Sequence, residues 1–143
     1  MGTDLMSSLL RNLLALVGGA IVAGMGIAVI ETLGALAYPP PAGFDPANEA
    51  AMRAFIHSLP PAAFGYILAA YGVGTFGGVW VTTRFSVRRT TRQGWMLGLV
   101  FFAAGIINFL KYPHPVWFIA MALVLFPAAT WVAVRLGRPR LRD

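Results

Sequence analysis

The sequence of 143 residues contains no cysteine, few charged side chains and only five acidic ones. Without cysteine, disulfide bonds, thiolate nucleophiles and cysteine-ligated metal sites are excluded. Charged residues make up 11% of the chain, against about a quarter in an average soluble domain, so they could not cover a water-facing surface. The composition therefore argues against a soluble enzyme, a disordered chain and a nucleic-acid-binding domain.

Hydrophobic residues, at 58%, are concentrated in four runs, and spanning a bilayer as a helix takes about 20 mostly apolar residues. We expect spanning helices over residues 9–38, 61–83, 94–110 and 115–134. The predicted fold class is all-α: a polytopic membrane protein with a single domain, residues 1–143, built as a bundle of four transmembrane helices. The fourth span carries the bulkiest side chains, so we expect it to face lipid most and to kink at Pro127.

The basic residues lie between the apolar runs and predict the orientation of the chain. Nine of the eleven Lys and Arg residues are expected on one side of the membrane. One is Arg11, four lie in the connection 84–93, and four lie in the tail 135–143. The other side holds Arg53 and Lys111. The positive-inside rule then places both termini in the cytoplasm, where these segments should attract anionic lipid headgroups. Because the chain is also rich in Arg, Ala and Gly, we expect a bacterial, multi-pass inner-membrane protein.

The outer loop, residues 39–60, contains a predicted amphipathic helix between the first two spans. Asp45 is a suitable N-cap residue, and Pro46 suits the first helical position. Apolar and polar residues then recur on opposite sides of the segment. Such a helix would lie along the outer bilayer surface or cap the mouth of the bundle.

Small residues at helical spacing predict where the spans pack, because helices in lipid associate through close contact of small side chains. The glycines expected at these contacts are Gly24, Gly74, Gly78, Gly94, Gly98 and Gly105. In the first span, Gly24 shares a stripe with Ala20, Ala28 and Glu31. We expect these stripes to pack within one bundle, and the alternative is a seam between two copies of the chain.

Glu31 is the residue that most strongly indicates a function. If Tyr38 marks the membrane interface, Glu31 lies about 10 Å deeper, at a rise of about 1.5 Å per residue. A carboxylate at that depth costs a few kcal/mol unless it is protonated, paired or exposed to water. We expect it to face the bundle interior or an outward-opening cavity. It would serve there as a proton-handling or cation-binding group, or as a structural contact, for example with Asn108.

The other candidate ligand contacts lie near the same end of the bundle: Tyr38, Asn108, Lys111, Tyr112 and His114. Asn108 is also typical of an interhelical hydrogen bond, and Lys111 either anchors a helix end or pairs with Glu31. A metal site formed by Glu31, His57 and His114 is the alternative that the spacing supports least, because no short-spaced ligand pair is present. No phosphate loop or dinucleotide motif indicates a cofactor.

Three functions remain open. The first is a protein that binds, and in an assembly transports, a small or lipidic ligand in an outward-facing cavity around Glu31. The second is a non-catalytic accessory or structural subunit, whose partner is another copy or another membrane protein. The third is an intramembrane enzyme that uses Glu31 with His114 or His57, although no GxSxG motif or catalytic triad is present. We rank the first narrowly above the second and expect no enzymatic activity, and no nucleic acid as a partner.

Overall fold

The computed structural model describes residues 2–87 and 91–138, and these residues form five α-helices and no β-strand. The helices are α1 Gly2–Ala37, α2 Glu49–Ser58, α3 Pro61–Phe85, α4 Arg92–Lys111 and α5 Val116–Gly137. Within the described chain, α1, α3, α4 and α5 are long and apolar enough to cross a membrane. The prediction of an all-helical chain with four such helices is therefore confirmed.

The helix boundaries extend past the predicted spans at several ends. α1 begins at Gly2, before the predicted start at residue 9, and α5 ends at Gly137, after the predicted end at residue 134. Hydropathy predicts the part of a helix that fits in lipid, whereas the helical hydrogen bonds continue into the polar residues beyond it. Parts of the predicted basic connection and tail lie outside the described residues, namely Arg88, Arg89, Arg140 and Arg142.

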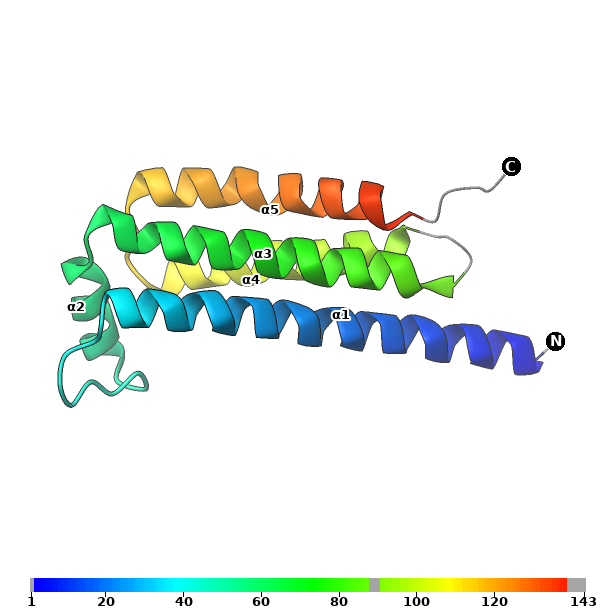
Figure 1. Cartoon of the computed structure of the whole chain (residues 1–143), viewed down its shortest axis with the longest axis horizontal. Helices are drawn as coiled ribbons and strands as arrows, with labels where there is room; N and C mark the ends of the chain where they lie inside the picture. The colour runs from blue at the N-terminus through cyan, green and yellow to red at the C-terminus, as the bar shows by residue number, and fades with distance from the viewer. Residues whose placement is uncertain (1, 88–90, 139–143) are drawn as a thin grey trace.

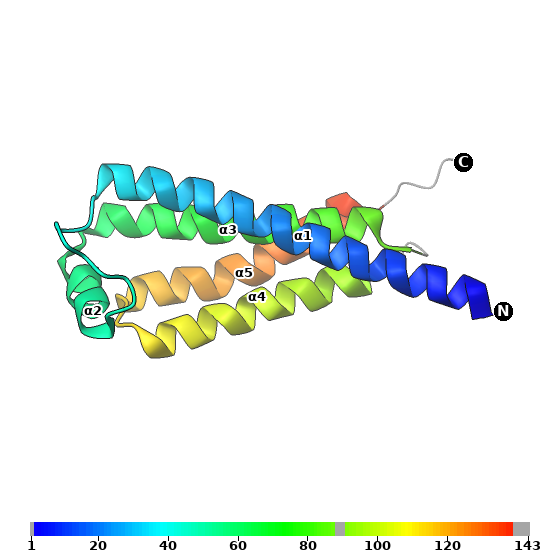
Figure 2. The ribbon, with the colours of Figure 1, turned by 90° about the horizontal axis from the view of Figure 1, so that it is seen from below.

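α3 is the central helix of the bundle. It packs against α1 on one side and against α4 and α5 on the other, and its contact with α1 is the most extensive in the described chain. The short helix α2 lies across one end of the bundle, which we call the α2 end (Figures 1 and 2). The beginning of α1 and the end of α5 both lie at the opposite end, which we call the terminal end (Figure 1).

Two glycines of α3 allow its backbone to approach α1. A Cβ added at Gly78 would lie 2.7 Å from the carbonyl oxygen of Gly19 and 2.8 Å from the Cβ of Ala23. A Cβ added at Gly74 would lie 2.5 Å from the Ile27 side chain and 3.1 Å from the Ala23 carbonyl oxygen. The spacing of Gly74 and Gly78 thus marks a backbone-to-backbone contact between two helices, which is how small residues stabilise membrane bundles.

The glycines of α4 receive larger side chains from its neighbours. Gly94 lies against Thr83 of α3, while Gly98 and Gly105 lie against Thr130 and Phe126 of α5. All three glycines are buried. α4 therefore packs against both α3 and α5, because its glycines leave space for the side chains of these two helices.

The predicted packing face of α1 differs from the one in the structure. Gly24 is exposed, and a Cβ added there would meet nothing within 4 Å. The buried face of α1 instead carries Ala15, Gly19 and Ala23. Small residues occur on more than one face of α1, so their spacing did not identify the face that meets α3. In the predicted stripe, Ala20, Gly24, Ala28 and Glu31 are all exposed.

The expectation that the fourth span faces lipid most is wrong. α5 buries Phe118 and Phe126, and α1 is the least buried of the four long helices in the described chain. Phe126 and Thr130 of α5 fill the space beside Gly105 and Gly98 of α4, whereas Trp117 and Trp131 of α5 are exposed. Pro127 lies inside α5, which continues as helix on both sides of it.

Polar side chains fasten α1 to α3 at the terminal end. The Thr82 hydroxyl donates a hydrogen bond to the carbonyl oxygen of Ala15 over 3.1 Å, and the Val87 backbone N–H donates to the Asn12 side-chain oxygen over 2.8 Å. Both bonds join segments far apart in the sequence. Together with the glycine contact, they fix the position of α1 along α3.

We predict that Gly78→Val lowers the free energy of unfolding by about 1–3 kcal/mol, because the added methyl groups would collide with backbone and side-chain atoms of α1. Denaturant-induced unfolding of the purified protein in uncharged micelles, followed by circular dichroism, measures this effect. Gly24→Val is the matched control and should leave the unfolding free energy nearly unchanged. Equal losses in the two variants would contradict the assigned packing face.

Candidate functional site

A partly enclosed cavity of about 470 Å³ lies at the α2 end, between α1, α3 and the segment that joins them. We call it the Glu31 cavity, because Glu31 of α1 is the charged residue among the described residues that line it. The other walls are made mainly by apolar and aromatic side chains from all three segments: Ala35, Tyr38, Phe44, Met52, Phe55 and Tyr66. The cavity therefore combines a hydrocarbon-like lining with one carboxylate.

Glu31 lies two turns before the end of α1 and forms no hydrogen bond or ion pair with another described residue. Its side chain is exposed and does not lie in the bundle interior. The carboxylate is close enough to Tyr71 of α3 for an electrostatic interaction. Glu31 therefore lines a partly enclosed cavity at the α2 end, and the direction in which this cavity opens relative to a membrane stays a prediction.

Aromatic rings surround the rest of the Glu31 cavity. The rings of Tyr38 and Tyr66 meet edge to face with centroids 6.2 Å apart, and those of Phe44 and Phe55 lie 5.1 Å apart. Tyr66 fits against α1 because Gly34 has no side chain, and a Cβ there would lie 3.1 Å from the Cβ of Tyr66. The candidate ligand contact Tyr38 is thus in the cavity wall, together with rings that the sequence did not single out.

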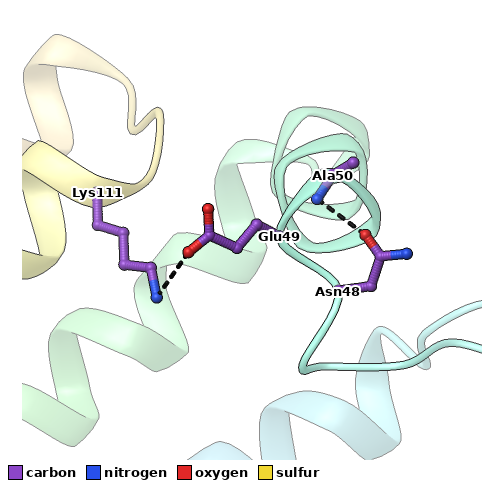
Figure 3. A network of polar contacts seen from close by, with 4 residues as sticks. All are labelled: Asn48, Glu49, Ala50 and Lys111. Carbon is purple, nitrogen blue, oxygen red and sulfur yellow. Dashed lines mark hydrogen bonds and ion pairs between the residues drawn. The ribbon is translucent and has the colours of Figure 1, made fainter.

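The start of α2 differs from the prediction. The N-cap residue is Asn48, whose side-chain oxygen accepts hydrogen bonds from the N–H groups of Ala50 and Ala51 over 3.0 and 3.2 Å (Figure 3). Asp45 accepts a bond from the N–H of Ala47 and so closes a turn before the helix. Both Asp and Asn suit an N-cap, and the turn at Asp45 delays the helix to Glu49.

Lys111 forms an ion pair with Glu49 and not with Glu31. The Lys111 ammonium lies 3.1 Å from a Glu49 carboxylate oxygen, which joins the end of α4 to the start of α2 (Figure 3). The same ammonium lies over the ring of Tyr112, 5.2 Å from its centroid. Lys111 thus links α4 to α2, and neither Lys111 nor Tyr112 lines the Glu31 cavity.

Asn108 has a different partner from the one considered in the sequence analysis. Its amide donates a hydrogen bond over 3.4 Å to the hydroxyl oxygen of Tyr71, and not to Glu31. The Tyr71 ring stacks on Phe126 with centroids 5.3 Å apart. Asn108, Tyr71 and the buried Thr75 line a second, smaller cavity of about 120 Å³ among the long helices. Asn108 is therefore an interhelical contact in the bundle core.

His114 is part of an aromatic cluster between α4 and α5. Its ring stacks on Phe118 with centroids 5.1 Å apart and an interplanar angle of 13°. Nδ1 lies 2.8 Å from the Tyr112 carbonyl oxygen, which can only accept, so Nδ1 carries the proton. Burial lowers the pKa of His114 below its usual value of 6.5, although the bond to Tyr112 acts in the opposite direction.

The predicted metal ligands are not brought together. His57 and His114 line a cavity of about 200 Å³ beside Phe64, whereas Glu31 lines the larger one. Within residues 2–87 and 91–138, no three His, Cys, Asp or Glu side chains form a group that could hold a metal ion. An enzyme that uses Glu31 with either histidine would need Glu31 and that histidine in one cavity. In this structure, Glu31 and the two histidines line different cavities.

Three residues that matter for the arrangement were missed by the sequence analysis. Tyr71 receives the Asn108 hydrogen bond, and Asn12 and Thr82 join α1 to α3. Each is a polar residue in or next to a long apolar run, which is the signal that could have identified them as interhelical contacts.

The chain matches no protein-family model, no curated protein and no solved structure in the comparisons. The class of protein therefore follows from the fold. Within the described chain, four helices are long and apolar enough to span a membrane, which is the pattern of a multi-pass membrane protein.

We predict that acidification destabilises the protein partly through His114. Because its pKa is below 6.5 in the folded state, the unfolded chain binds the proton first, so stability falls as the pH drops below about 6.5. His114→Phe keeps a ring stacked on Phe118. When the pH falls from about 7.5 to about 5, this variant should lose less thermal stability than the wild type. His57→Phe, at an exposed position, is the control and should retain the wild-type pH dependence. An unaltered pH profile in the His114 variant would contradict this role.

We predict that the Glu49–Lys111 ion pair holds α2 in place without contributing much to global stability. Both side chains are about half exposed, and such pairs are worth at most about 1 kcal/mol. Lys111→Gln should therefore leave the unfolding free energy within about 1 kcal/mol of wild type, yet speed amide hydrogen exchange in α2 about threefold.

Two further variants test the pairing itself. The double variant Glu49→Lys, Lys111→Glu reverses the two charges and should restore slow amide hydrogen exchange in α2. Arg53→Gln removes another charge from α2 and should have no effect. The same exchange rates in the Lys111 and Arg53 variants would exclude the ion pair as the restraint on α2.

Proposed function

We propose that this protein binds a small, largely hydrocarbon molecule in the Glu31 cavity. The observation that carries the proposal is the cavity itself: about 470 Å³, partly enclosed, and lined by apolar and aromatic side chains. Sites for small molecules have this size and lining, with a small number of polar groups that fix the orientation of the ligand. Here Glu31, Tyr38 and Tyr66 provide the polar groups.

The ligand enters, on this proposal, past α2. The apolar edge of α2 supplies Met52 and Phe55 to the cavity wall, yet none of the α2 residues is buried. α2 touches the four long helices at few points, and the Glu49–Lys111 ion pair is exposed. An element with few buried contacts opens at low free-energy cost, so α2 is the wall that can move.

The distribution of basic residues supports an orientation for the site. Arg11, Arg84, Arg92 and Arg135 belong to the terminal ends of the four long helices. Under the positive-inside rule, this end faces the cytoplasm and contacts anionic headgroups, and the Glu31 cavity opens in the other leaflet. We therefore infer a multi-pass protein of the bacterial inner membrane, with both termini inside and its ligand taken from the outer side.

A second candidate, an accessory subunit of a membrane complex, is supported by the exposed face of α1. Ala20, Gly24 and Ala28 lie on this face and are exposed, and a Cβ added at Gly24 would meet no described residue within 4 Å. Small residues of this kind allow a helix of another copy or another membrane protein to approach closely. Transport of a ligand would also need such an assembly, because four helices enclose too little space for a wide channel.

We predict that filling the cavity abolishes ligand binding. The probe is the neutral fluorophore diphenylhexatriene, measured by equilibrium dialysis with the same uncharged detergent on both sides of the membrane. Wild-type protein should bind it, and Ala35→Trp should weaken binding at least about tenfold, because Ala35 lines the cavity.

Ala28→Trp is the matched control, because Ala28 lies two turns earlier on α1, is exposed and does not line the cavity. It should bind the probe as the wild type does. Equal binding by both tryptophan variants would contradict the proposed site. Absence of binding by the wild type would favour the accessory subunit.

A further inference from the structure

Glu31 and Glu49, two of the acidic residues at the α2 end, differ in one respect. Glu49 has a counter-charge at 3.1 Å in Lys111. Glu31 has neither an ion pair nor a hydrogen bond with any residue in the described part of the chain, although it lies about two turns inside the end of α1. A carboxylate at that depth is costly without a partner, and residues 2–87 and 91–138 supply none. The missing partner would have to come from outside the chain.

The surroundings of Glu31 favour a cation as this partner. Among the described residues, no Lys, Arg or His lines the Glu31 cavity, so no side chain of the lining repels a positive charge. Gly34 follows Glu31 by one turn on the same face of α1, and the Tyr66 ring packs against Gly34. An aromatic face therefore lies next to the carboxylate. Tyr38, Phe44 and Phe55 add further rings, and aromatic faces attract cations most strongly where water is excluded.

We propose that the ligand of the Glu31 cavity is an amphiphilic cation. This inference rests on the proposed function and specifies its ligand class. The positive group, a protonated amine or a quaternary ammonium, lies between the Glu31 carboxylate and the Tyr66 ring. The hydrocarbon body lies along the apolar wall formed by α2 and α3, where Met52, Phe55 and Ile67 provide contact area. The carboxylate would reject an anionic ligand of the same shape.

Three fluorescent probes that share one hydrocarbon core test this inference. They are diphenylhexatriene, which is neutral, its trimethylammonium derivative, which is cationic, and its propionic acid derivative, which is anionic above neutral pH. Equilibrium dialysis in uncharged micelles measures the affinity of each. The wild type should bind the cationic probe at least about tenfold more tightly than the neutral one, and should bind the anionic one least.

Glu31→Gln tests the source of this preference. The substitution keeps the shape of the side chain and removes its charge, so affinity for the cationic probe should fall about tenfold while affinity for the neutral probe stays within about twofold. Asp45→Asn is the control, because it removes the charge of another exposed acid at this end, keeps an oxygen that can accept from the Ala47 N–H, and does not line the cavity. It should leave all three affinities unchanged.

The outcomes separate the two proposals. Equal affinity of the wild type for the neutral and cationic probes, or a preference that survives Glu31→Gln, would overturn the cationic ligand while leaving the cavity as an apolar binding site. Binding of none of the three probes would overturn both proposals. Because the comparison among probes is made on the wild type, the inference stays testable even if the Glu31 variant fails to fold.

Discussion

The close approach of α1 and α3 is the contact on which the rest of the structure depends. Lipid tails are as apolar as the helices, so membrane helices are held together by packing and not by exclusion from water. Gly74 and Gly78 let the α3 backbone reach Gly19 and Ala23 of α1. α3 then carries α4 and α5 on its other side, whereas α1 has no other comparably extensive contact in the described chain.

The same two helices form the Glu31 cavity because the residues that face each other change along their length. Near the middle of the bundle, glycine meets alanine and the backbones approach closely. Toward the α2 end, Gly34 of α1 meets Tyr66, whose ring then meets Tyr38. At this level the Tyr66 and Tyr38 rings line the cavity between α1 and α3, and α2 and the loop before it form its remaining wall. The cavity therefore begins where Tyr66 takes the place of Gly74 and Gly78 on the side of α3 that meets α1.

The chemistry of a carboxylate explains why Glu31 differs from other polar residues of the long helices. A hydroxyl or an amide can donate a hydrogen bond to a helix carbonyl or a neighbouring side chain. Thr82, Thr83 and Asn108 do so, to Ala15, Val79 and Tyr71. An ionised carboxylate can only accept, and the helix carbonyls around it have no proton to give. Among the described residues, Glu31 accordingly has no hydrogen-bond donor or cation bonded to it.

The amino-acid sequence by itself determined the four long helices and the unusual position of Glu31. Each helix satisfies its own backbone hydrogen bonds in lipid, so composition and length are sufficient to predict it. Only the tertiary structure decided that α1 packs through Ala23 and not Gly24, and that Lys111 pairs with Glu49. The reason is that α1 carries small residues on more than one face, and local spacing does not encode the rotation of a helix about its axis. That rotation is set by the neighbouring helices, and it decides which side chains share a cavity.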